Sequence, residues 1–318
     1  MTRKMLTILV PVYNEAPNIE PLFAALAPVL AELQASYDVE LLFTDNHSED
    51  ATFEKLQARG AVDPRVRVLR FSRNFGFQRS ILCGYLNARG DAAIQIDCDL
   101  QDPPALIVQF VQRWQAGAKV VYGVRRSRKE GWLITVLRQA FYRLIDRLSD
   151  TRLPLDAGDF RLVDRCVIDE LGRMEDYHPY LRGAIAAMGF EQVGIPYDRS
   201  ERRHGESKFP LSKLVALAVD GILNHSVVPL RLATYTGLAV SLLTLGMLVA
   251  TVIGRLLYGG AWPAGFATLT VLILLSLSLN ALFLGVIGEY LGRIYQQVKR
   301  RSLTIVEARV NDPPAPRG

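Results

Sequence analysis

The sequence predicts an α/β domain with a mostly parallel sheet, followed by two helices that are long and apolar enough to cross a membrane. Two observations predict this architecture. Strand and helix patterns alternate through residues 1–123, which is typical of βαβ units and a parallel sheet. Two stretches without any charge, Ala233–Ile253 and Phe266–Gly288, each reach the length of about 20 residues that a membrane-spanning helix needs.

Short β-branched runs alternate with helical spacing in the first part of the chain. The β-branched runs predict strands at Thr7–Val12, Val39–Asp45, Val66–Phe71, Ala92–Asp97 and Lys119–Gly123. The segments between them predict helices at Asn18–Leu33, Glu49–Gly60, Phe77–Arg89 and Pro103–Ala116. Parallel α/β sheets bind ligands beyond the carboxyl ends of their strands. Polar side chains at those ends, on Asn14, Asp45 and Asp97–Asp99, therefore mark a candidate site.

The later part of the chain predicts a membrane anchor. The predicted divisions are a cytoplasmic catalytic domain at 1–210, an interfacial amphipathic helix at 211–229, a two-helix transmembrane region at 230–292 and a basic cytoplasmic tail at 293–318. Cations flank the two apolar stretches, and the positive-inside rule then predicts a multi-pass protein of the inner (plasma) membrane with its large domain in the cytoplasm. The alternatives are two buried core helices and, for Leu211–Val228, an ordinary amphipathic helix of the domain.

The composition of the chain limits the classes of molecule that it is expected to bind. The chain has 37 Lys and Arg against 32 Asp and Glu, a net charge of +5, which favours a phosphate-bearing partner. The basic regions lack the interleaved aromatic residues of a nucleic-acid fold, which argues against DNA or RNA. The three cysteines form no CxxC pair, which indicates a reducing compartment and no structural zinc site. Glycine motifs for dinucleotides and P-loops are absent from the sequence.

A pair of aspartates directly after the fourth predicted strand indicates a metal site. Asp97 and Asp99, two residues apart, can turn toward one Mg²⁺ or Mn²⁺, and both ions prefer oxygen ligands and leave positions open for phosphate oxygens. Gln101 can add a neutral oxygen. The alternative is a polar loop in which Asp102 caps the next helix.

Two weaker motifs end the first and second predicted strands, Val10–Glu15 and Asp45–Asp50. Tyr13 could lie beside a nucleobase, and Asp45 could accept hydrogen bonds from a base or a ribose. For Asp45 the alternative is a cap on the following helix.

Taken together, these segments resemble the inverting GT-A enzymes of glycosyltransferase family 2, in the branch of bactoprenol glucosyltransferases and dolichol-phosphate mannose synthases. The resemblance runs in order over roughly residues 5–230 and is carried by five segments: Val10–Glu15, Asp45, Ser72–Gly76, Gly90–Pro104 and Ala157–Leu162. The two apolar stretches also fit the bactoprenol branch. The resemblance implies a GT-A, Rossmann-like domain.

The resemblance also implies residue roles. A nucleotide-sugar pocket would be lined by Pro11, Tyr13, Glu15, Asp45 and Asp97, the metal would be held by Asp97, Asp99 and Gln101, and the catalytic residues would be Asp159 and Asp99. The family often has Asp-Asp-Gly-Ser where this chain has Asp45-Asn46-His47-Ser48, so the identity of the base stays open. A hydroxyl acceptor needs a base, whereas a phosphate is already an anion. Asp159 is therefore either a base or a positioning group, and the alternative is a salt bridge with Arg161 or another cation.

The implied reaction transfers a sugar, with UDP-glucose as the first expectation, to polyprenyl (undecaprenyl) phosphate at the lipid bilayer, for envelope glycan modification. Two basic segments would oppose the acceptor phosphate, through Arg126, Arg128, Arg203 and Lys208. Attraction to anionic headgroups is the alternative for each of these cations. Further expectations are a homo-oligomer, possibly a tetramer, a separate flippase and a downstream transferase.

Three competing functions stay open. A processive polysaccharide synthase would carry a Gln-x-x-Arg-Trp motif, and Gln112–Trp114 has the wrong spacing. Transfer to diacylglycerol would make a true base essential. A non-catalytic lipid-carrier translocation subunit would also have two spans, but the intact aspartate pair argues against it.

Overall fold

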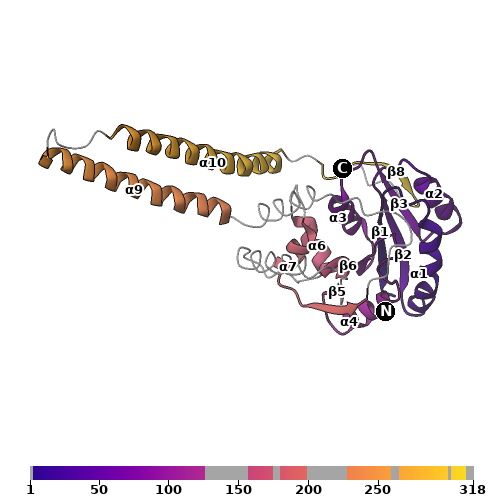
Figure 1. The fold of residues 1–318 in the computed structure, drawn as a ribbon. Coiled ribbons are helices and arrows are strands. Elements are labelled where there is room, and N and C mark those ends of the chain that lie inside the picture. Colours follow the sequence, from indigo (N-terminus) through magenta and orange to yellow (C-terminus); the bar gives the residue numbers. More distant parts are fainter. Residues whose placement is uncertain are drawn as a thin grey trace. The chain divides into compact units, whose positions relative to one another are not determined.

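The computed structural model describes residues 3–125, 157–174, 180–198, 228–258, 265–299 and 302–312. The chain divides into two compact units, of which the first is an α/β domain that includes the segment after Arg300 and the second contains two long helices (Figure 1). Residues 211–227, most of the predicted interfacial helix, lie outside the described residues.

The domain is built on one mixed sheet of eight strands in the described part of the chain. In chain order these are β1 (Met5–Val12), β2 (Asp38–Asp45), β3 (Val66–Phe71), β4 (Ala92–Gln95), β5 (Val120–Arg125), β6 (Ala157–Asp164), β7 (Gln192–Tyr197) and β8 (Val306–Val310). Their order across the sheet is β7-β5-β6-β4-β1-β2-β3-β8. Strands β4, β1, β2 and β3 are mutually parallel, as predicted, and the buried side chains along β1 reflect a central strand covered on both faces.

Helices cover both faces of this sheet and create two hydrophobic cores. The helices of the domain are α1 (Ile19–Leu33), α2 (Thr52–Val62), α3 (Phe77–Asn87), α4 (Leu106–Gln115), α6 (Arg165–Arg173) and α7 (Leu181–Ala187). Helices α1, α2 and α4 pack with Ile8 and its neighbours, whereas α3, α6 and α7 pack with Leu9 on the opposite face. Successive strand side chains point to opposite faces, so the two residues serve different cores.

Helix α3 approaches β1 so closely that it requires a glycine. A Cβ atom on Gly84 would lie 2.1 Å from Cδ1 and 2.9 Å from Cγ of Leu9. The contact fixes α3 over the strand that leads into the candidate site.

Three strands, β6, β7 and β8, were not among the five that the sequence predicts. β6 runs antiparallel between β4 and β5, so the fourth and fifth predicted strands are not neighbours. β8 lies within the segment predicted as a basic tail and pairs antiparallel with β3 (Figure 1). Asn311 Nδ2 anchors the end of β8 by donating to the carbonyls of Gly60 and Val66 at 2.7 and 2.9 Å.

The second unit holds α9 (Val228–Tyr258) and α10 (Phe266–Val298), which contact one another. Their most apolar windows, Ala233–Gly254 and Leu275–Gly292, have mean hydropathies of 2.1 and 1.4. Only 7% and 0% of these windows is buried within the described residues, unlike the core helix of a soluble protein. Both helices are long and apolar enough to cross a membrane.

Candidate active site

The carboxyl ends of β1, β2 and β4 meet at one edge of the sheet. Each is followed by a residue that is not glycine and has a positive φ: Asn14 (55°), His47 (63°) and Leu100 (57°). Such backbone is uncommon outside glycine and concentrates at functional sites. Three of the four such residues among those described lie at this edge, where the sequence places the candidate site.

Hydrogen bonds join the turn after β1 to the turn after β2. The Asn14 amide donates to Ser48 Oγ at 2.9 Å, and the Glu49 amide donates back to Asn14 Oδ1 at 2.8 Å. The Glu15 amide donates to Thr52 Oγ1 at 2.8 Å. These bonds hold the two predicted nucleotide motifs against one another.

The predicted pocket residues of the first turn differ in exposure. Pro11 is buried, whereas Tyr13 is 42% exposed, which leaves its ring able to stack on a planar ligand. The half-buried Glu15 accepts a hydrogen bond from Asn18 Nδ2 at 2.5 Å. Tyr13 therefore offers an accessible aromatic surface at this edge.

Asp45 is a fully buried carboxylate with one oxygen still able to accept a hydrogen bond. Its Oδ1 accepts from the Ser48 amide at 3.0 Å. Its Oδ2 accepts no hydrogen bond from a described residue and lies 3.8 Å from Arg70 Nη1. Burial raises the pKa of Asp45, and the hydrogen bonds from Ser48 and the charge of Arg70 oppose this rise. A buried acceptor in this state suits a hydrogen-bond donor on a ligand.

Asp97 and Asp99 follow β4 as predicted. Gln95 Nε2 donates to Asp97 Oδ1 at 2.8 Å, and the Gln101 amide donates to Asp99 Oδ1 at 3.1 Å. Burial and the charges of Asp102, Asp159 and Asp99 together raise the pKa of Asp97 to about 7. The structure thus brings four carboxylates close enough to perturb one another.

A divalent cation at this edge would offset the mutual repulsion of these carboxylates. Among the described residues no group of three or more His, Cys, Asp and Glu side chains is arranged to hold a metal. A cation held by Asp97 and Asp99 would therefore need further oxygen ligands from elsewhere, as Mg²⁺ takes from substrate phosphates and water. At this turn Gln101 contacts Asp99 through its backbone amide, which donates to Asp99 Oδ1.

Asp102 is fully buried and accepts a hydrogen bond from Tyr197 rather than capping α4. The Tyr197 hydroxyl donates to Asp102 Oδ1, and Arg125 Nε lies 3.4 Å from that hydroxyl. Burial and the neighbouring Asp102 raise the pKa of Tyr197 to about 12, so its proton stays in place. Helix α4 begins with Ala105 as its N-cap, without a side-chain hydrogen bond.

Asp159 on β6 is paired with a cation that sequence reasoning missed. Arg182 of α7 donates to it from Nε at 2.9 Å and from Nη2 at 2.7 Å, which is a two-point ion pair. Burial opposes ionisation of Asp159, but the hydrogen bonds and charge of Arg182, with the charge of Arg161, hold its pKa below the ordinary value. Arg161, the partner considered from the sequence, donates instead to the Gly158 carbonyl at 2.9 Å.

The structure brings some of the predicted site residues together, and others lie outside the described residues. Asp45, Asp97, Asp99 and Asp159 all belong to strand ends at this edge. The predicted acceptor-phosphate residues Arg126, Arg128, Arg203 and Lys208 lie outside the described residues. Arg182, Arg70 and Tyr197 were not predicted, because no local motif marks a side chain whose partner lies far away in the chain.

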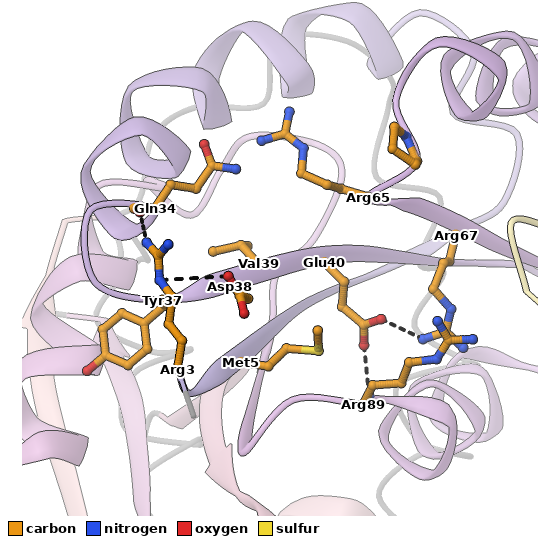
Figure 2. Close-up of a pocket in the computed structure, with 11 residues that line it drawn as sticks. Arg3, Met5, Gln34, Tyr37, Asp38, Val39, Glu40, Arg65, Arg67 and Arg89 are labelled. Atoms are coloured by element: carbon orange, nitrogen blue, oxygen red, sulfur yellow. Dashed lines mark hydrogen bonds and ion pairs between the residues drawn. The ribbon is translucent and has the colours of Figure 1, made fainter. Parts of the chain in front are cut away.

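A cavity of about 460 Å³ lies at the opposite end of the sheet (Figure 2). Met5, Asp38 and Val39 line it at the amino ends of β1 and β2. Its four arginines each pair with a carboxylate: Arg3 with Asp38, Arg65 with Asp63, Arg67 with Glu40, and Arg89 with Asp312. This balanced cluster is distinct from the carboxylate-rich edge.

The mixed sheet, covered by helices and ending in carboxylates, is a GT-A fold of the Rossmann-like kind. A family model described as glycosyl transferase family 2 matches residues 7–172. The uncharacterized glycosyltransferase YkcC of Bacillus subtilis (strain 168) is 42% identical over 302 residues, 95% of this chain and 93% of that protein. The chain therefore belongs to glycosyl transferase family 2.

Two further proteins resemble this chain, one at higher and one at lower sequence identity. The SfII prophage-derived bactoprenol glucosyl transferase of Shigella flexneri is 36% identical over 303 residues, 95% of this chain and 97% of that protein. A glucosyl-3-phosphoglycerate synthase structure from Mycobacterium tuberculosis, solved with Mn²⁺, UDP-glucose and glycerol 3-phosphate, has a TM-score of 0.46 at 18% identity. The match covers 69% of this chain and 78% of the synthase chain.

Proposed function

We propose that this protein transfers a sugar from a nucleotide-sugar to a polyprenyl phosphate, with inversion at the anomeric carbon. The carboxylate-rich edge around Asp97 and Asp99 supports this proposal most directly. A bactoprenol glucosyl transferase aligns with 95% of this chain at 36% identity, and this relationship supports the lipid acceptor. UDP-glucose is the proposed donor and undecaprenyl phosphate the proposed acceptor.

The donor nucleotide is proposed to lie across the turns after β1 and β2. Tyr13 offers an exposed ring for stacking, and Asp45 Oδ2 offers a buried acceptor. Pro11, Glu15 and Asp97 complete the proposed pocket. The hydrogen bonds between the two turns support a preformed site.

Asp97 and Asp99 are proposed to hold Mg²⁺ or Mn²⁺ against the donor diphosphate, with Gln101 beside them. When bound, the ion would stabilise the negative charge of the departing diphosphate. The acceptor phosphate oxygen forms the new bond to the anomeric carbon, while the bond from that carbon to the diphosphate breaks and its electron pair leaves with the diphosphate. Arg126, Arg128, Arg203 and Lys208 remain the proposed partners of the acceptor phosphate.

Asp159 is proposed to act by position rather than by removing a proton. Both of its oxygens accept hydrogen bonds from Arg182, and its pKa lies below the ordinary value. A carboxylate so engaged is a weak base, but it holds a guanidinium beside the other carboxylates. A phosphate acceptor needs no stronger base, which favours it over the hydroxyl of diacylglycerol.

Helices α9 and α10 are proposed to anchor the protein in the inner membrane as a multi-pass protein, with the catalytic domain in the cytoplasm. Their exposed apolar surfaces support this placement. A separate flippase and a downstream transferase would then use the product. The protein is also proposed to be a homo-oligomer, with a tetramer as the first expectation, which light scattering of the protein in detergent would test.

The acceptor can be tested by offering the purified full chain three lipids with the same radiolabelled UDP-glucose. Undecaprenyl phosphate should become labelled, whereas undecaprenol and diacylglycerol should not, since both lack the phosphate nucleophile. Other nucleotide-sugars in parallel reactions identify the sugar. Labelling of diacylglycerol in preference to undecaprenyl phosphate would contradict the proposed acceptor.

A further inference from the structure

Strand β8 carries a bulge at Glu307, beside Arg70 of β3, and Arg70 in turn pairs in register with Asp45 at the end of β2. Arg70 of β3 pairs with Ala308, whereas the next residue, Phe71, pairs with Val306, so Glu307 is the extra residue on β8. A bulge changes the direction in which a side chain points. Here the Glu307 carboxylate accepts a hydrogen bond from Arg70 Nε at 3.1 Å.

Arg70 is held at several points around its guanidinium. Besides the bond to Glu307, its Nη2 donates to the Ser48 carbonyl at 3.2 Å. The guanidinium lies over the ring of Phe53, 4.6 Å from the centroid, and the side chain is only 18% exposed. These contacts fix the distance of 3.8 Å between Arg70 Nη1 and Asp45 Oδ2.

That distance has a specific chemical consequence for Asp45. It is short enough for the positive charge to favour the ionised carboxylate, but too long for a hydrogen bond. Asp45 Oδ2 therefore keeps its capacity to accept a hydrogen bond from a ligand. Two carboxylates compete for one guanidinium, and Glu307 takes the direct hydrogen bond.

We propose that Glu307 is a positioning residue of the donor pocket: it holds Arg70 away from hydrogen-bonding distance of Asp45, so that a nucleoside diphosphate can use Asp45 Oδ2. The inference rests on the proposed function and deepens it. Without Glu307, Asp45 is the carboxylate that remains in an ion pair with Arg70. The Arg70 guanidinium then moves to within hydrogen-bonding distance of Asp45 Oδ2. The segment that follows α10 thereby belongs to the donor site.

The test is calorimetric titration of the full chain in detergent and Mg²⁺ with UDP and with GDP. Glu307→Ala should weaken binding of the preferred nucleotide about three- to fivefold, the size of a partly exposed ion pair. Glu307→Gln should lose less, because its amide oxygen still accepts from Arg70 Nε. In transfer assays the donor KM should rise while kcat at saturating donor stays unchanged.

A double-mutant cycle separates positioning through Arg70 from a general effect on β8. In an Arg70→Gln background, Glu307→Ala should have no further effect. Arg309→Ala is the matched control, because Arg309 lies on the same strand but pairs with Asp312. Its nucleotide affinity should equal that of the wild type.

Two outcomes would overturn this inference but leave the proposed donor site standing. They are wild-type nucleotide affinity in Glu307→Ala, and a loss of affinity on Glu307→Ala that is equal with and without Arg70. A loss in Arg309→Ala as large as that in Glu307→Ala also overturns it, since strand loosening would then explain both. Failure of the wild-type protein to bind either nucleotide overturns the proposed donor site and this inference with it.

Discussion

Arg182 donates two hydrogen bonds to Asp159, from Nε to Oδ1 at 2.9 Å and from Nη2 to Oδ2 at 2.7 Å. The pair joins α7 to the end of β6, beside the aspartates that follow β4. Asp159 is buried, with 8% of its surface exposed, so loss of Arg182 leaves a carboxylate charge in a poorly solvated place, whereas the Arg182 side chain is 36% exposed.

Substitution of either member of this pair should slow sugar transfer by a similar factor. We expect Asp159→Asn and Arg182→Gln each to lower kcat about 100-fold, the scale of removing one preorganised electrostatic group. The double variant should be little worse than either single variant, because the two residues act as one unit. Arg173→Gln, which removes an exposed pair with Glu170, is the control and should retain wild-type rates.

The pH profile distinguishes positioning from proton abstraction. Burial opposes ionisation of Asp159, but Arg182 and Arg161 hold its pKa below the ordinary value of 3.8, so it stays ionised from about pH 5 upward. The residual activity of Asp159→Asn should therefore follow the wild-type profile above pH 5. An acidic limb present in the wild type and absent from the variant would instead indicate a general base.

Part of this site could be predicted from polar residues at the carboxyl ends of the predicted strands, for a physical reason. Asp45, Asp97 and Asp99 stand directly after apolar runs, and the carboxyl ends of parallel strands necessarily share an edge. Arg182 escaped prediction because its partner is a tertiary neighbour. The antiparallel insertion of β6 depends on pairings across long stretches of chain, which local periodicity does not encode.

The C-terminal strand was missed for a similar reason. Val306–Val310 is short, and its preceding residues are basic, so composition favoured a solvated tail. Its strand state arises from pairing with the open edge of β3 and from the Asn311 anchor, both distant in sequence. The two apolar helices, by contrast, were predicted, because length and absence of charge are local properties. Both run beyond the uncharged stretches, α9 at each end and α10 as far as Val298.

The N-cap of α6 should make the domain sensitive to acid. Asp164 accepts from the Cys166 amide at 3.0 Å and from Trp114 Nε1 at 2.7 Å. Burial alone would raise its pKa, but these hydrogen bonds and that from Lys119 hold it at about 2, against an ordinary value of 3.8. A lowered pKa means that the stabilisation is complete above about pH 4 and is lost as the pH falls toward 2.

Asp164→Ala should accordingly lower the free energy of unfolding by roughly 1–2 kcal/mol at pH 7. The variant should also lose less stability than the wild type between pH 4 and pH 2. Thermal melting of the full chain in detergent, followed by tryptophan fluorescence, measures both. Asp169→Ala on the same helix removes a long, exposed ion pair with Arg165 and should melt like the wild type.

The close approach of α3 to β1 should not tolerate an added methyl group. Gly84→Ala would place Cβ within 3 Å of Cγ and both Cδ atoms of Leu9, so the whole side chain must move. We expect a loss of roughly 1–3 kcal/mol of stability, as for other overpacked cores. Leu9→Ala in the same chain should make the added methyl group less costly, and equal costs in both backgrounds would refute the contact.

The most direct test of the account is transfer of radiolabel from UDP-glucose to undecaprenyl phosphate by the full chain, with Mn²⁺ or Mg²⁺ and with EDTA. We expect labelled lipid from the wild type, little from Asp99→Asn, and none with EDTA. Asp63→Asn, which alters a carboxylate paired with Arg65 at the other end of the sheet, should behave like the wild type. Wild-type labelling by Asp99→Asn in the presence of EDTA would contradict the proposed role of the aspartate pair, and no labelling from any nucleotide-sugar would contradict the proposed reaction.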